Sequence, residues 1–195
     1  MAVDIDDVTR EEIGRISSGV RTRIEARTKA SWVRPNRMHL TLHFFGDADA
    51  ALEQCARMAL AEPIAEPSFD LSFQGLGFFP ERGSPRVLWL GIRDGIHALR
   101  RIHAALSARM GTLTDASQPF TPHLTLARFR ERSPRAQYAE IARIPAAAGP
   151  SRIDRVTLYE SCLSPASLDL RSGRPEVARR AGPTYVPLAE GPLRT

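Results

Sequence analysis

The stretch His39-Leu40-Thr41-Leu42 recurs later in the chain as His123-Leu124-Thr125-Leu126. Each copy lies in an apolar run that is typical of a β-strand. Residues two apart in a strand point to the same side, so the His and Thr of each copy share one face and the leucines lie on the other. Two such strands could line one cleft with two imidazoles and two hydroxyls. We interpret the repeat as a candidate active site; the alternative is a pair of sheet strands whose histidines are merely hydrogen-bonded at a sheet end.

Composition indicates a globular chain. It has 195 residues, of which 43% are hydrophobic and 25% charged, which fits one domain or one domain with two lobes. No stretch approaches the roughly 18–20 apolar residues of a membrane span, and the start of the chain is acidic, unlike a signal peptide. We therefore expect a cytoplasmic protein without membrane contact. Cys55 and Cys162 form no C-x-x-C pattern and are expected to be free thiols, with Cys55 on the buried side of a helix.

The chain is basic, with a net charge of +5 and a pI near 10. Lys29 is the only lysine, so nearly all of the positive charge is arginine. This balance suits a polyanionic partner such as RNA. A codon bias in an Ala-, Pro- and Arg-rich chain would give the same composition, so the charge only supports a nucleic-acid partner.

Outside the motifs, apolar periodicity divides the chain into helices and strands. Helices are predicted at 9–27, opening with a Thr9/Glu12 capping box, and at 50–61, 94–110 and 134–144. Strands are predicted at 2–5, 32–33, 38–45, 69–73, 86–92, within 119–129, at 156–161 and at 184–188. Each half repeats the order helix, motif strand, helix, strand. We therefore expect an α+β fold in which the two motif strands face each other.

These residues resemble the 2H phosphoesterase superfamily, and within it the RNA 2′,3′-cyclic phosphodiesterases first described as 2′-5′ RNA ligases. The resemblance rests on His39-Leu-Thr-Leu-His-Phe-Phe-Gly46 and on Pro119-Phe-Thr-Pro-His-Leu-Thr-Leu-Ala-Arg128. It extends through segments 75–80, 85–91, 156–161 and 182–188, and so spans nearly the whole chain. The chain departs from the family in a first strand that is a few residues short and in a polar, Arg-rich insertion at 164–181, a loop that bears on substrate access.

The resemblance implies a single domain over residues 1–195, with two pseudo-symmetric lobes around a central cleft. Each lobe would be an antiparallel sheet with outer helices. The implied activity is hydrolysis of RNA-terminal 2′,3′-cyclic phosphates by a monomer, with RNA ends, including those of tRNA fragments, as partners. No cofactor and no metal are implied. The sequence agrees, because His39 and His43 share a strand face without a third ligand at metal-binding spacing.

Opening a 2′,3′-cyclic phosphate with water requires a base for the water proton and an acid for the departing ribose oxygen. Two histidines on facing strands suit this reaction, because imidazole titrates near neutral pH. From the family we expect His123 to be the base and His39 to be the acid. Protonation of the 3′ oxygen by His39 would leave a 2′-phosphomonoester.

Other residues of the two motif regions are candidates for substrate binding. Thr41 and Thr125 would donate hydrogen bonds to the non-bridging phosphate oxygens, with β-branched strand filling as the alternative. Arg128 matches a phosphate-binding arginine of the family. Strict alternation puts it on the leucine face, so that role requires a bulge or a strand end. The aromatic candidates for stacking a terminal base, each with core packing as the alternative, are Phe45, Phe79 and Phe120.

Three other functions are compatible with the same residues. The site could join a cyclic phosphate to a 5′-hydroxyl as a 2′-5′ linkage, or it could act on a small cyclic nucleotide. Alternatively, the chain could bind RNA ends without turnover, which the two intact histidines disfavour. Two further histidines are not assigned to catalysis. We expect His43 to lie at the cleft or at a sheet edge, and His103 to be a hydrogen-bonded core residue of the 94–110 helix.

Overall fold

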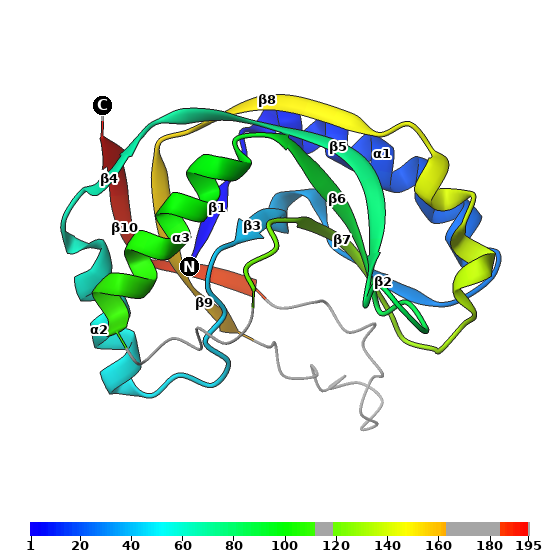
Figure 1. Ribbon diagram of the computed structural model, residues 1–195. Coiled ribbons are helices and arrows are strands. Elements are labelled where there is room, and N and C mark those ends of the chain that lie inside the picture. Colours follow the sequence, from blue (N-terminus) through cyan, green and yellow to red (C-terminus); the bar gives the residue numbers. More distant parts are fainter. Residues whose placement is uncertain (112–118, 163–183, 195) are drawn as a thin grey trace, which may run out of the picture.

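The computed structural model describes residues 1–111, 119–162 and 184–194 (Figure 1). The strands form two five-stranded sheets, with helices packed against them. This arrangement confirms the predicted α+β fold with two sheets. The insertion predicted at 164–181 lies outside the described residues. Within the described part of the chain, no helix is both long and apolar enough to span a membrane.

The first sheet has the strand order β3-β1-β9-β10-β4. Its strands are β3 (His39–Thr41), β1 (Ala2–Asp4), β9 (Arg155–Cys162), β10 (Thr184–Arg194) and β4 (Ile64–Pro67). The neighbours are antiparallel except for β10 and β4, which run parallel. The N-terminal strand β1 is therefore an inner strand, and the first motif strand, β3, forms an edge.

The second sheet has the order β2-β7-β6-β5-β8 and is antiparallel throughout. Its strands are β2 (Ala30–Trp32), β7 (Leu124–Phe129), β6 (Val87–Asp94), β5 (Phe69–Phe79) and β8 (Ala147–Ile153). Both sheets draw strands from the beginning and the later part of the chain. In each half, a helix precedes the motif strand and further strands follow it, as predicted, but the strands of each half are divided between the two sheets.

Three α-helices cover the sheets. α2 (Ala50–Ala61) and α3 (Ile96–Met110) pack against the first sheet and against each other, whereas α1 (Asp7–Glu25) packs along β8 (Figure 1). The predicted capping box is wrong: the Asp6 side chain accepts from the Thr9 N–H, and Glu12 instead accepts from the Gly149 N–H. An aspartate one turn earlier supplies the same N-terminal acceptor.

Short 3₁₀ helices replace the helix predicted at 134–144. They are η3 (Arg135–Tyr138) and η4 (Ile141–Arg143), and a third, η1 (Pro35–Arg37), precedes β3. Each of η3 and η4 buries one side chain, Tyr138 in the first and Ile141 in the second. β4 and β8 were not predicted, because Pro, Gly and Ala interrupt the strand pattern in both segments.

The leucines of both motifs form part of the hydrophobic core, as predicted. Leu40, Leu124 and Leu126 are each 0% exposed, and Leu42 is 4% exposed. Burying four such side chains fixes which face of each motif strand points away from the core. Neighbouring residues of a strand point to opposite sides, so the histidine and threonine of each motif are displayed on the face opposite to the leucines.

Candidate active site

The two motifs meet where the sheets adjoin. β3 and β7 lie side by side near the centre of the molecule, beneath the arch of β5 and β8 (Figure 1). His39 opens β3, and His123 immediately precedes β7. Both imidazoles are half-buried. The structure thus brings together two segments that are far apart in the sequence, with each histidine on the non-core face.

His39 is enclosed by aromatic rings of the first sheet. The ring of Tyr159 stacks on the imidazole, with centroids 5.7 Å apart, and that of Tyr185 meets it edge-on at 4.5 Å. Burial lowers the pKa of His39, and the carboxylate of Asp4 opposes this effect, as does a hydrogen bond to the backbone of Arg37. His39 therefore has a negative charge beside it that favours its protonated form.

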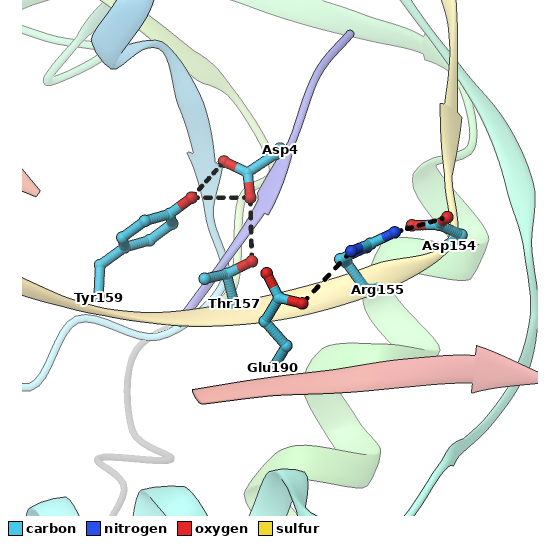
Figure 2. Close-up of polar contacts among 6 residues, drawn as sticks. All are labelled: Asp4, Asp154, Arg155, Thr157, Tyr159 and Glu190. Carbon is cyan, nitrogen blue, oxygen red and sulfur yellow. Dashed lines mark hydrogen bonds and ion pairs between the residues drawn. The ribbon is translucent and has the colours of Figure 1, made fainter. Parts of the chain in front are cut away.

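Asp4 is a site residue that the sequence prediction missed. Its carboxylate accepts hydrogen bonds from Thr157 Oγ1 at 3.0 Å and from Tyr159 Oη at 2.8 Å (Figure 2). Burial, together with this bond to Asp4, raises the pKa of Tyr159 to about 12, so the phenol stays a donor. The signal in the sequence is a lone carboxylate between Val3 and Ile5 in an apolar strand, which is unusual unless it is paired.

His123 is enclosed by aromatic rings of the second sheet. Phe79 meets the imidazole edge-on at 4.9 Å, and Trp89 lies 6.4 Å away between centroids. His123 Nδ1 is 2.8 Å from the carbonyl oxygen of Thr121. A carbonyl can only accept, so Nδ1 carries the hydrogen and the neutral ring keeps its lone pair on Nε2.

The electrostatic surroundings of His123 differ from those of His39. Burial lowers the pKa of His123, the bond to Thr121 opposes this, and the positive charge of Arg128 lowers the pKa further. Both imidazoles are therefore shifted by burial, but the charge beside His39 is negative and the charge near His123 is positive. The charge of Arg128 thus favours neutral His123, which could act as a base.

A β-bulge places Arg128 on the motif face. Thr125 pairs with Trp89 and Ala127 pairs with Leu88, so β7 contains an extra residue between these pairs. Arg128 then pairs with Val87, which shares a face of β6 with Trp89. The bulge that the predicted role of Arg128 required is present, and Arg128 lies on the same face as Thr125. Both Arg128 and Thr41 are exposed.

The three aromatic candidates separate into two groups. Phe79 contacts the imidazole of His123, whereas Phe45 and Phe120 pack against the core as the ends of a stack of four rings. In this stack, His43 lies 6.0 Å from Phe45 and 4.2 Å from His103, and His103 lies 4.3 Å from Phe120. Phe79 is therefore the candidate best placed beside the site. His43 is buried instead of lining the site.

Two hollows on the described part of the surface lie away from the motifs. They are lined by residues 83–84 with 132–135, and by Arg27 with residues between 136 and 143; neither includes a motif residue. Among the described residues, no group of three or more His, Cys, Asp or Glu is placed to hold a metal ion. Cys55 and Cys162 are free thiols, and Cys55 packs against the core.

The two sheets define an α+β fold that displays one His-x-Thr segment from each sheet, and comparison with known proteins identifies the family. The profile of the 2′-5′ RNA ligase superfamily matches residues 6–162. The chain belongs to this superfamily.

Individual relatives agree with this assignment. The RNA 2′,3′-cyclic phosphodiesterase of Archaeoglobus fulgidus is 35% identical over 150 residues, which cover 73% of this chain and 77% of that protein. The protein of the same name from Methanothermobacter thermautotrophicus is 29% identical over 171 residues, covering 85% and 90%. The crystal structure of E. coli LigT in its apo form has a TM-score of 0.70 at 25% identity, covering 100% of this chain and 95% of LigT.

Proposed function

We propose that this protein hydrolyses RNA-terminal 2′,3′-cyclic phosphates to 2′-phosphomonoesters, with His39 and His123 as the two proton-transfer groups and without a metal ion. The observation that carries the proposal is the pair of His-x-Thr segments, one from each sheet, on strands that lie against each other. The names of the relatives support the same substrate. The proposal requires both imidazoles to reach one phosphorus from opposite sides, as in-line displacement demands.

The charges around the two histidines support a division of roles. His123 Nε2 takes a proton from water while the water oxygen forms a bond to phosphorus. The bond from phosphorus to the 3′ oxygen breaks, and His39 gives its proton to that oxygen. The positive charge of Arg128 favours neutral His123, and the negative charge of Asp4 favours protonated His39. Each proton transfer is expected to contribute about 10²–10⁴-fold to the rate.

The remaining motif residues would bind the phosphate and its nucleoside. The hydroxyls of Thr41 and Thr125 donate to the non-bridging oxygens, where negative charge grows in the transition state. Arg128 adds a charged donor on the same face as Thr125, which its position beyond the bulge supports. Phe79, edge-on to His123, is the candidate for contact with a terminal base.

Product analysis tests this proposal. A 5′-labelled oligoribonucleotide ending in a 2′,3′-cyclic phosphate is incubated with the protein in EDTA, and the 2′- and 3′-phosphate products are separated. The proposal expects a 2′-phosphate end; a 3′-phosphate end or loss of activity in EDTA would contradict it. A parallel reaction on a cyclic mononucleotide distinguishes an RNA enzyme from one that prefers small nucleotides.

The superfamily name favours ligation as a second candidate. The same site run in reverse would join the cyclic phosphate to a 5′-hydroxyl RNA as a 2′-5′ linkage. Water competes with that hydroxyl, so we expect hydrolysis to predominate unless the 5′ end is held nearby. Adding excess 5′-hydroxyl RNA to the product assay measures the ratio of the two reactions.

A further inference from the structure

Asp4 lies directly opposite His39 on the neighbouring strand. The register of β1 and β3 pairs the two residues, and side chains opposite each other in an antiparallel pair share a face with Cβ atoms about 4.5–5.5 Å apart. Thr157 and Tyr159, two apart on β9, hold the Asp4 carboxylate by their hydroxyls (Figure 2). The ring of the same Tyr159 stacks on the His39 imidazole. The carboxylate therefore lies on the same face as His39, and the phenol that donates to it also stacks on the imidazole.

The charged and titratable groups that act on His39 come from every neighbouring strand. Asp4 of β1 raises the pKa of His39, the amino group of Met1 lowers it, and Tyr159 of β9 and Tyr185 of β10 are phenols. Asp4 is thus the only one of these groups that favours a positive imidazole. Glu190, further along the same face, is paired with Arg155 (Figure 2).

We propose that Asp4 is a positioning residue for His39: held by Thr157 and Tyr159, it fixes the imidazole and keeps a negative charge beside it, so that His39 carries the proton that the leaving oxygen needs. This inference rests on the proposed function, because it explains how one of two similarly buried histidines acts as the acid. Asp4 itself touches neither substrate nor the reacting atoms; it acts through the protonation and orientation of His39.

The titration of His39 tests the proposal without any activity measurement. The Cε1–H signals of the histidines are followed by NMR against pH in the wild-type protein, in Asp4→Asn and in Tyr159→Phe. Asn has nearly the shape of Asp, and its amide oxygen can still accept both hydroxyl protons, so packing is retained. We expect Asp4→Asn to lower the titration midpoint of His39. Tyr159→Phe removes a donor that partly neutralises the carboxylate and should move the midpoint upward.

A matched carboxylate elsewhere provides the control. Asp94, on β6, also accepts a hydrogen bond from a strand hydroxyl, that of Ser72, but no site histidine is paired with it. Asp94→Asn should leave the His39 midpoint unchanged. The proposal is overturned if folded Asp4→Asn titrates like the wild type, or if Asp4→Asn and Tyr159→Phe move the midpoint in the same direction.

The pH–rate profile provides a second readout. In kcat/KM the base sets the acidic limb and the acid sets the alkaline limb. We expect Asp4→Asn to move only the alkaline limb to lower pH. At pH values above that limb, kcat/KM should then be about tenfold lower than in the wild type. An equal loss at all pH values would indicate a purely structural role and would refute the proposal. If the wild-type protein opened no cyclic phosphate, the proposed function would fail, while the NMR titration would still decide the role of Asp4.

Discussion

Protonation of His43 should destabilise the fold, because this residue is buried within the stack of four aromatic rings. Burial and the neighbouring His103 lower the pKa of His43 from 6.5 to about 4. Below pH 6.5 the unfolded chain binds a proton that the folded protein does not, so stability falls as the pH drops toward 4. The interval between the two pKa values is 6.5 − 4 = 2.5 pH units. At about 1.4 kcal/mol per pH unit, the free energy of unfolding falls by about 3 kcal/mol over this interval.

Replacing His43 by Phe isolates this contribution. Phe keeps a flat ring in the stack, and the His103 carbonyl that His43 Nε2 contacts at 3.2 Å also accepts from the Ser107 hydroxyl at 2.9 Å. Urea unfolding of the wild type and of His43→Phe is compared at pH 7.5 and pH 4.5, with exposed His97→Phe as the control. We expect the wild type to lose about 2–3 kcal/mol more than His43→Phe between these pH values. Parallel losses, within about 0.5 kcal/mol, would refute the reasoning.

Three further substitutions test the site and its support. An added Cβ at Gly77 would lie 2.1 Å from the ring of Trp89, which lies beside His123. We therefore expect Gly77→Ala to shift the tryptophan fluorescence and to lower kcat/KM on cyclic-phosphate RNA. An unchanged fluorescence spectrum would contradict this expectation. Arg128→Gln should weaken substrate binding by about 1–3 kcal/mol and reduce the salt dependence of KM; an unchanged KM would remove Arg128 from the phosphate site. Arg101 is 63% exposed but forms two hydrogen bonds to Glu66, whose side chain is 7% exposed, so Arg101→Leu should lower the free energy of unfolding, because it leaves the buried carboxylate without its partner; an unchanged free energy of unfolding would show that the pair contributes little.

The sequence was most informative where a pattern depends on local geometry alone. Alternation predicted which face of each motif is buried, and the core positions of Leu40 and Leu124 confirm it. Helical periodicity predicted α2 at its observed bounds and α3 within two residues of its start. Both patterns follow from burial of one side of a regular element, which needs no knowledge of distant partners.

Features that depend on pairing between distant strands could not be predicted in this way. The bulge in β7 determines on which face of the sheet Arg128 lies. A bulge is defined by the pairing of β7 with β6, so it cannot be recognised from the sequence of β7 alone. Asp4 and Tyr159 are 155 residues apart in the chain, and their contact follows from the insertion of β1 between β3 and β9. Short strands such as β4 owe their conformation to the sheet edge they join, here β10, and only weakly to their own residues.

The rates of His39→Ala and His123→Ala on cyclic-phosphate RNA test most directly the claim that the two sheets contribute one proton-transfer group each. His97→Ala, at an exposed position of α3, is the matched control, and thermal unfolding verifies that each variant is folded. We predict that each site variant loses at least about 100-fold in kcat/KM while the control keeps the wild-type rate. A folded variant of either site histidine that kept more than about a tenth of the wild-type rate would contradict the account.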